Sequence, residues 1–337
     1  MKVNCVIVTY NRLALLKECL AAIEKQTYPI HKVIVIDNCS TDGTKEYLKA
    51  YAVRPQFQVI RTEQNIGGAG GFSLGVKTSV LGGGDYTWMM DDDTIPSPKA
   101  LEALMQTATQ SNDIGFVCSK VLWTDNTLHP RNIPGGLKKD TIENNGITAY
   151  RCEVCTFVSV LVSSRAVYKV GLPIKEFFIW FDDIEYTLRI TRAGFKNYYT
   201  EQSIVVHKTP DVYDPNIEQA PVNMAKRFYY QTRNTCYFKH REQPNKLLFR
   251  LSIWNKLRIL KRRINRRKDG HKQEFLDAVK KGCHDGLTFY PKIEYLPLNP
   301  QLHSRSATYI KRNGLLIRKI TIKSSRPFQC AYHPLTP

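Results

Sequence analysis

Short apolar runs alternate with amphipathic segments through the first 120 residues, and this alternation limits the folds open to the chain. The runs at residues 3–9, 33–36, 58–60, 87–90 and 114–118 are mostly apolar and rich in β-branched residues. Because polar residues do not alternate within them, both faces of each strand are expected to be buried. The pattern predicts an α/β fold with a mostly parallel central sheet flanked by helices.

Helices are expected between these strands, and further elements follow in a looser order. Asn11 is placed to cap the first helix, whose apolar residues fall on one face. Residues 123–152 are rich in Gly, Asn, Pro and Lys and are predicted to form an inserted loop. The other predictions are helices at about 43–51, 71–80, 98–110, 183–193 and 220–240, and strands at 157–162 and 203–206.

Polar clusters follow three of the predicted strands, at the edge where parallel α/β sheets bind ligands. The sequence TYNR (residues 9–12) follows the first strand, DN (37–38) the second and DDD (91–93) the fourth. One such cluster could be a solvated loop. Three clusters that converge on one edge favour a ligand site.

A glycine-rich stretch, NIGGAGGFSLG at residues 65–75, matches neither common phosphate-binding motif. It is not a GxGxxG directly after the first strand, nor a GxxxxGK[ST], so both interpretations are disfavoured. Its five glycines would let backbone amides approach a ligand, ahead of a helix N-terminus. A flexible turn is the alternative, and we favour a donor-side role.

Asp91 and Asp93 alternate along the chain, so an extended backbone would aim both carboxylates at one cation. Oxygen ligands of this kind suit Mg²⁺ or Mn²⁺, which bridge to a diphosphate. Such an ion would offset the repulsion among neighbouring carboxylates. A lone histidine is more often structural, but His207, at the end of a predicted strand, would complete a set that suits Mn²⁺.

A second acidic cluster lies in FFIWFDDIEYTLR (residues 177–189), where aromatic residues lead to Asp182 and Asp183. Acids at a helix N-terminus are readily explained by capping and by the helix dipole. The other interpretation is a sugar site, in which the aromatic wall stacks on the sugar and a carboxylate deprotonates its hydroxyl.

The net charge of +19 comes from the C-terminal part of the chain. Residues 241–337 carry 22 Lys and Arg against 6 Asp and Glu, whereas residues 1–240 carry 27 against 24. No apolar run has the length of a signal or a membrane span, so we expect a cytoplasmic protein. Nine cysteines fit reduced thiols. Cys152 and Cys155 are predicted strand cysteines, with a zinc site as the less favoured alternative.

Residues 246–268, KLLFRLSIWNKLRILKRRINRRK, place apolar residues near helical spacing among Arg and Lys. Such a helix can lie on an anionic bilayer. Alternatively, its apolar face packs on the core and its charged face is solvated. Nucleic acid is disfavoured as a partner because no recognised nucleic-acid module accompanies the charge. We favour peripheral attachment to the inner face of the cell membrane.

Together these motifs resemble the inverting glycosyltransferases of family 2, which have the GT-A fold. The resemblance covers residues 1 to about 240 and is carried by IVTYNR, VIVIDNCSTDGT, NIGGAGG, WMMDDD, WFDDIEYTLR with the following Gly194, and His207. GGAGGF, the three consecutive aspartates and FYYQTRN are similar to the branch of galactofuranosyltransferases and related rhamnosyltransferases. The expected organisation is a GT-A domain at 1–243, with a donor half at about 1–120 and an acceptor half at about 121–243, and a basic region at 244–337 that is helical to about 290.

The resemblance implies roles for the residues that bind the donor and the metal. The metal ligands would be Asp91, Asp93 and His207, holding Mn²⁺ or Mg²⁺. Residues near the nucleoside and the donor sugar would come from all three strand ends and from the glycine-rich stretch. The implied donor-binding residues are Thr9, Asn11, Arg12, Asp37, Asn65, Gly67, Gly68, Asp91 and Asp92.

The resemblance also implies the chemistry. Asp183 would be the general base, while Trp180 and Asp182 would bind the acceptor. The expected reaction is metal-dependent, inverting transfer of galactofuranose from UDP-galactofuranose to a lipid-linked or growing cell-surface polysaccharide. The alternatives are a rhamnosyltransferase that uses dTDP-rhamnose, or a non-catalytic sugar-nucleotide-binding scaffold at a membrane. Arg233 and Asn234, in FYYQTRN, receive no defined role.

Overall fold

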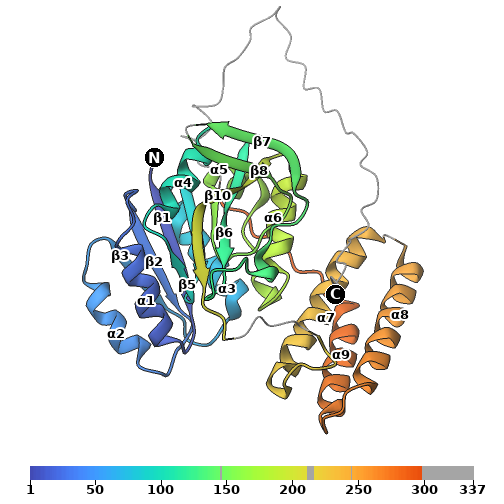
Figure 1. Cartoon of the computed structure of the whole chain (residues 1–337). Helices are drawn as coiled ribbons and strands as arrows, with labels where there is room; N and C mark the ends of the chain where they lie inside the picture. The colour runs from blue at the N-terminus through green and yellow to red at the C-terminus, as the bar shows by residue number, and fades with distance from the viewer. Residues whose placement is uncertain (145, 211–215, 244, 298–337) are drawn as a thin grey trace, which may run out of the picture.

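The computed structural model describes residues 1–144, 146–210, 216–243 and 245–297. A central sheet lies between helices, and three further helices pack together beside it (Figure 1). This arrangement confirms the predicted fold class. The strands of the described part are β1 (Val3–Thr9), β2 (Lys32–Asp37), β3 (Phe57–Arg61), β4 (Tyr86–Asp91), β5 (Thr94–Pro96), β6 (Ile114–Leu122), β7 (Lys138–Asn144), β8 (Ile147–Arg151), β9 (Val160–Ser163) and β10 (Lys196–His207).

The sheet has the strand order β3-β2-β1-β4-β9-β6-β10-β8-β7, and β5 pairs with β10 outside this path. β3, β2, β1 and β4 are parallel neighbours, as the sequence predicts. β9 lies antiparallel between β4 and β6 and separates this parallel half from the parallel pair β6 and β10. The fold is therefore mixed, with its longest parallel part at the N-terminal end of the chain.

Helices cover both faces because successive side chains of the strands point to opposite sides. Cys5 and Ile7 of β1 face the core under α1, α2 and α4, whereas Val6 and Val8 face the core under α3, α5 and α6. The helices are α1 (Leu13–Ile23), α2 (Thr44–Ala52), α3 (Gly67–Leu81), α4 (Ala100–Ala108), α5 (Ser164–Val170), α6 (Asp182–Arg192), α7 (Ala225–Glu242), α8 (Lys246–Asn265) and α9 (Lys272–Gly286).

The glycine-rich stretch forms the first turns of α3, so the helix begins at Gly67 rather than near residue 71. A Cβ atom at Gly71 would lie 2.5 Å from Cγ1 of Val8, and one at Gly75 would lie 2.2 Å from Cγ1 of Val6. No side chain fits at these distances. The glycines therefore let α3 lie directly on β1.

Three local predictions are wrong. Asn11 does not cap α1: the N-cap is Arg12, and Asn11 has φ +53° in the turn before it. The inserted segment is more than a loop, because it contains the hairpin of β7 and β8, which extends the sheet beyond β10. Cys152 and Cys155 are buried, but they lie in the connection between β8 and β9 and not in a strand.

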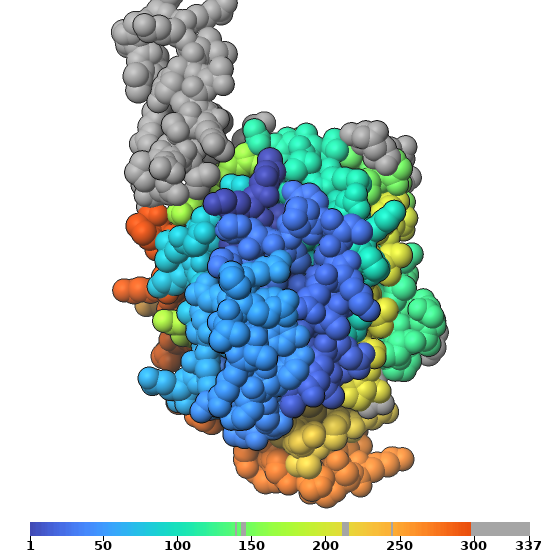
Figure 2. All heavy atoms as spheres, turned by 90° about the vertical axis from the view of Figure 1, so that its left-hand side faces the viewer, coloured from blue at the N-terminus to red at the C-terminus, as the bar shows by residue number. Residues whose placement is uncertain are grey.

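Helices α7, α8 and α9 pack around apolar residues of their own, including Phe228, Ile253 and Phe275. The boundary expected near residue 243 falls between α7 and α8, and helices from both sides of it share these cores. In Figure 2 the N-terminal residues, in blue, form the face toward the viewer, and residues of the helical bundle, in orange, lie below them. Within the described ranges, no helix is both long and apolar enough to span a bilayer.

Candidate active site

The strand ends that the sequence singles out meet at one edge of the sheet. Thr9 pairs with Asp37 across β1 and β2, and Val8 pairs with Asp91 across β1 and β4. The carboxyl ends of three parallel strands thus lie side by side, as the convergence argument requires.

Asp91, Asp93 and His207 form a compact group. Each offers one ligand atom, and these atoms lie within 4.8 Å of one another. The antiparallel pairing of β5 with β10 places His207 opposite Thr94, directly beside Asp93. Oδ1 of Asp93 lies 3.2 Å from Nε2 of His207. Two ligand atoms of an octahedral ion at about 2.1 Å would be about 3 Å apart, so this spacing fits a shared cation.

Asn132 fixes the ring of His207. Nδ1 of His207 lies 2.9 Å from Oδ1 of Asn132, whose Nδ2 donates to Thr156 at 2.8 Å. Because Oδ1 only accepts, Nδ1 carries the hydrogen, and Nε2 of the neutral ring turns a lone pair toward Asp93. A lone pair facing a buried carboxylate oxygen is unfavourable unless a proton or a cation lies between them. These residues therefore fit a divalent metal ion.

Asp92 points elsewhere. It is buried and accepts hydrogen bonds from the Thr9 hydroxyl at 2.7 Å and from the Tyr10 amide at 3.4 Å. Nη1 of Arg12 lies 3.4 Å from Asp92 and 2.5 Å from Asp93. Asp92 thus ties the end of β1 to the end of β4, and Arg12 offsets part of the negative charge. Sequence reasoning did not anticipate this pairing of Arg12.

Burial and neighbouring charges shift the pKa values of Asp91, Asp92 and Asp93. Burial, followed by the charge of Asp93, raises the pKa of Asp91 to about 7. Burial also raises the pKa of Asp92 to about 6, against the charge of Arg12. Burial would raise the pKa of Asp93 too, but its contact with His207 and the charge of Arg12 bring it below its usual value. A bound cation would relieve the repulsion that holds protons on this cluster.

The second acidic pair begins α6. Asp182 is buried, and burial together with the charge of Asp183 raises its pKa well above its usual value. Asp183 is more exposed; burial and the charge of Asp91 raise its pKa to about 6, although its own helix amide at Ile184 donates to Oδ1 at 2.7 Å. The charge of Asp91 contributes to the raised pKa of both residues, so the two acidic clusters are close enough to interact electrostatically.

Trp180 stands beside this pair. Its ring is partly exposed and packs edge to face on Phe228 of α7, with centroids 5.6 Å apart. One face of a fixed aromatic ring is what stacking on a sugar requires. Trp180 thus directly precedes the Phe181–Asp182–Asp183 stretch in the chain, with its ring held against Phe228.

Several predicted donor residues make hydrogen bonds within the protein. Asp37 is buried; it accepts from the Ser40 amide at 2.9 Å and pairs with Arg61. Oδ1 of Asn11, an exposed residue, accepts from the Thr41 amide at 2.6 Å. Thr9 and Asp37 are therefore buried residues whose hydrogen bonds within the protein stabilise the ends of β1 and β2.

The start of α3 joins this region. Oδ1 of Asn65 accepts from the Gly67 amide at 2.8 Å, and Nδ2 of buried Asn38 donates to the Gly67 carbonyl at 2.8 Å. A side chain at Gly68 would meet no atom within 4 Å, so open space lies beside it. Asn38 follows β2 directly, and sequence reasoning gave it no role.

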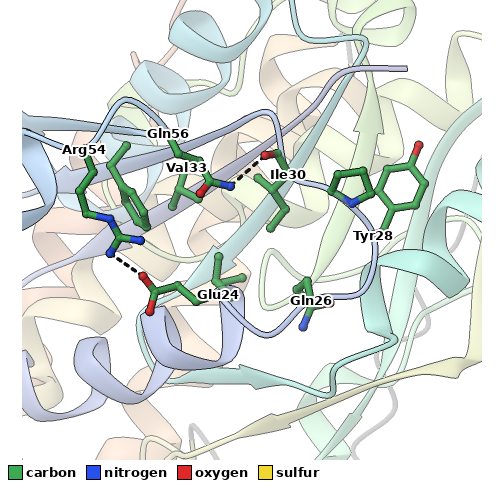
Figure 3. A pocket seen from close by; sticks show the side chains of 10 residues that line it. Glu24, Gln26, Tyr28, Ile30, Val33, Arg54 and Gln56 are labelled. Atoms are coloured by element: carbon green, nitrogen blue, oxygen red, sulfur yellow. Dashed lines mark hydrogen bonds and ion pairs between the residues drawn. The ribbon is translucent and has the colours of Figure 1, made fainter.

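A cavity of about 230 Å³ lies at the amino ends of β2 and β3, opposite the strand ends that carry the acidic residues (Figure 3). It is lined by Tyr28 and by residues at the beginnings of β2 and β3, and Glu24 and Arg54 pair at its side. Because β2 begins here and ends at Asp37, the cavity is remote from the acidic clusters. A second cavity of about 270 Å³ is lined partly by Asn132, the partner of His207.

Comparison with known proteins relates the chain to a protein family. Residues 5–171 match the model described as "Glycosyl transferase family 2". The chain is 25% identical to galactofuranosyltransferase GlfT1 of Mycolicibacterium smegmatis over 262 residues, which cover 73% of this chain and 85% of the relative. It is 26% identical to glycosyltransferase AglE of Haloferax volcanii over 210 residues, 61% of this chain and 66% of the relative.

Two solved structures are similar in fold. GalNAc-T7 with UDP, GalNAc and Mn²⁺ has a TM-score of 0.54 at 16% identity, covering 70% of this chain and 51% of that chain. S. aureus TarS 1-349 in complex with UDP has a TM-score of 0.50 at 15% identity, covering 86% and 90%. At these identities the likeness shows the GT-A fold.

Proposed function

Because the protein is a glycosyltransferase whose residues 5–171 form a family 2 domain, we propose that it transfers galactofuranose from UDP-galactofuranose with inversion. The acceptor is a hydroxyl of a lipid-linked or growing cell-surface polysaccharide. The observation that carries this proposal is the compact Asp91–Asp93–His207 group, whose Asp91 also acts electrostatically on Asp183. The choice of sugar rests on the GlfT1 relatives, which match nearly three quarters of the chain.

The reaction needs a base and a stabilised leaving group. Asp183 takes the proton of the acceptor hydroxyl, and the oxygen then attacks the anomeric carbon from the side opposite the nucleotide. A new C–O bond forms as the bond to the diphosphate breaks, so the configuration inverts. A pKa near neutrality suits Asp183 for this role. Asp91, Asp93 and His207 would hold Mn²⁺ or Mg²⁺, which offsets charge on the departing diphosphate.

The donor is held along the strand ends and the start of α3. Asn11 and Asn65 are accessible to the nucleotide, and the open space at Gly68 leaves room for it. Thr9, Asp37 and Asp92 are buried and support the site by orienting these strand ends. Arg12 keeps the negative charge of Asp92 and Asp93 low enough for a diphosphate to approach. On the acceptor side, Trp180 stacks on the sugar and Asp182 binds a hydroxyl.

A donor panel tests the sugar. Three donors are each tested in the presence of Mn²⁺: UDP-galactofuranose, dTDP-rhamnose and UDP-galactopyranose. The readouts are thermal stabilisation of the protein and hydrolysis of the donor. A ligand at about 100 times its Kd stabilises a protein by about 2.7 kcal/mol. UDP-galactofuranose should stabilise the protein most and be hydrolysed only with Mn²⁺. A preference for dTDP-rhamnose would favour the alternative sugar, and no response to any donor would contradict the proposal.

Helix α8 supports a membrane-bound acceptor. Phe249, Ile253 and Ile264 pack into the bundle, so one face of the helix is structural, as the core-packing alternative predicts. A second apolar row remains on the surface. Its members are Leu247, Leu248, Leu251 and Trp254, which are 67%, 52%, 53% and 61% exposed.

Exposed basic residues follow this row along the same helix, among them Arg258, Lys261 and Arg262. The guanidinium of Arg258 lies 5.5 Å from the Trp254 ring centroid, so the apolar and basic parts adjoin. Apolar insertion beside cationic side chains is the combination that binds anionic lipid surfaces. We therefore assign this face of α8 to an anionic bilayer.

Vesicle sedimentation tests this assignment. Changing Arg258, Lys261 and Arg262 to Gln should reduce binding to phosphatidylglycerol vesicles, at about 1 kcal/mol for each charge. Trp254→Ser should also weaken binding, and this loss should depend less on salt concentration than the loss caused by removing the charges. The matched control replaces Lys272 and Lys280 of α9 with Gln. Equal binding by all these variants would rule out α8 as the contact.

A further inference from the structure

Three aromatic residues just before α6 have positive φ angles, a backbone conformation that residues other than glycine rarely adopt. φ is +64° at Phe178, +66° at Trp180 and +69° at Phe181. Bulky residues stay in such conformations only where their surroundings hold them. Asp182 and Asp183 follow directly. Whatever holds this segment, residues 177–181, also determines where the proposed base lies.

One buried side chain of α7 contacts three carbonyl groups of the segment. Asn234 is fully buried. Its Nδ2 lies 3.0, 3.1 and 2.9 Å from the backbone oxygens of Phe177, Ile179 and Trp180. The two hydrogens of one amide are thus shared among three acceptors that belong to the strained segment.

Arg233 fixes the orientation of this amide. Its Nε and Nη2 donate to Oδ1 of Asn234 at 3.1 and 2.9 Å. Because a guanidinium only donates, Oδ1 faces the arginine and Nδ2 faces the segment. Arg233 also donates to the Phe177 carbonyl at 3.2 Å, and its guanidinium lies 4.0 Å from the Phe289 ring centroid. The pair Arg233–Asn234 therefore acts as one donor unit.

Of the two remaining carbonyls of the segment, that of Phe181 accepts from the Glu185 amide within α6, and that of Phe178 is contacted by α3. The amide of Ala69, in the first turn of α3, donates to the Phe178 oxygen at 3.1 Å. A Cβ at Gly67 would lie 2.1 Å from that oxygen, so no side chain fits there. The segment is thus held between α7 on one side and the start of α3 on the other.

From these contacts we infer that Asn234 is a positioning residue for the acceptor reaction, acting through residues 177–181 on Trp180 and Asp183. The inference rests on the proposed function for the meaning of that position. Without the amide, the carbonyls of Ile179 and Trp180 lose this donor, and the Phe177 carbonyl keeps only Arg233 and the Ile179 amide. The left-handed residues can then relax. The base and the stacking ring then move relative to the donor.

Two variants of Asn234 separate hydrogen-bond donation from packing. Asn234→Ala removes the side chain, and Asn234→Asp keeps its shape but presents no donor. The matched control is Asn4→Ala, because Asn4 is also buried and its Nδ2 donates to a single carbonyl, that of Ser79, at 3.0 Å. All variants are checked by circular dichroism, and their thermal unfolding is compared with that of the wild type.

Two readouts are measured on each full-length variant. Amide hydrogen exchange of residues 176–184 should become faster, on the order of tenfold, in both Asn234 variants but not in Asn4→Ala. Transfer to acceptor should lose kcat on the order of 10- to 100-fold, as misplacement of a catalytic group does, while the Kd for UDP with Mn²⁺ stays within about twofold.

The outcomes distinguish the two proposals. Unchanged exchange in both Asn234 variants overturns the positioning role whether or not any sugar is transferred. Faster exchange with unchanged kcat also overturns it, as does full activity in Asn234→Asp or an equal loss in Asn4→Ala. Absence of transfer by the wild type with every donor removes the proposed function instead, and the exchange result still shows whether Asn234 holds the segment.

Discussion

Asp91 and Asp93 lie at the ends of sheet strands with Arg12 and His207 beside them, whereas Asp182 and Asp183 follow a strained aromatic segment. Strand register places the first pair, and the charge of Arg12 lowers its repulsion. The second pair depends on contacts from α7 and α3 to residues 177–181. The first pair is therefore placed by the sheet itself, whereas the second pair, at the start of α6, is placed by tertiary contacts to the segment before it.

The largest expected effect is on the rate of transfer, and it distinguishes the roles of the two acidic clusters. Asp183→Asn should lower transfer by a factor of about 10² to 10⁴, because a positioned general base contributes about that much. Binding of Mn²⁺ and UDP, measured by calorimetry, should persist. Asp91→Asn serves as the comparison and should lose Mn²⁺ binding. Full transfer by Asp183→Asn would remove the division of roles between the clusters.

A smaller effect concerns the support of the metal group. Asn132→Ala should weaken Mn²⁺ binding about 10- to 100-fold, since His207 loses the partner that fixes its ring. The measurement is a Mn²⁺ titration in the presence of UDP. Asn255→Ala, at an exposed position of α8, is the control. Equal affinities would show that the sheet edge alone orients the histidine.

The next prediction tests the rigidity of the sheet edge. Gly75→Ala should destabilise the protein by about 1–3 kcal/mol, because the new methyl group overlaps Val6 of β1. Gly68→Ala lies in the same helix but meets open space, so its unfolding midpoint should not fall. Chemical denaturation measures both. Equal stability of the two variants would mean that α3 can shift away from β1.

The smallest effect is on the pH dependence of the rate. The pKa of Asp183 is raised to about 6, mainly by burial, and a base works only when deprotonated. Transfer should therefore be constant above about pH 7 and fall about tenfold for each pH unit below about 6. The profile of kcat/KM at saturating Mn²⁺ measures this. A rate that stays constant down to pH 4.5 would place the base outside this acidic pocket.

Much of the fold and of the candidate site could be predicted because it depends on local patterns. Buried parallel strands need continuous apolar residues, and their carboxyl ends must meet at one edge. This reasoning located Asp37, Asp91 and Asp93 at that edge. It placed the start of α3 about four residues too late, because glycine is typical of turns; here glycine lies within the helix and permits close packing on β1. It also missed the β7–β8 hairpin, whose residues carry no clear strand pattern.

By itself the sequence determined the parallel half of the sheet, the acidic groups and the basic surface of the C-terminal part. Only the tertiary structure decided which side chains support them. Asn132, Arg12 and Asn234 act on residues far away in the chain, through the β5–β10 pairing, the β1–β4 contact and the packing of α7. A hydrogen bond between distant segments leaves no periodic signal in either segment, because it depends on geometry that exists only after folding.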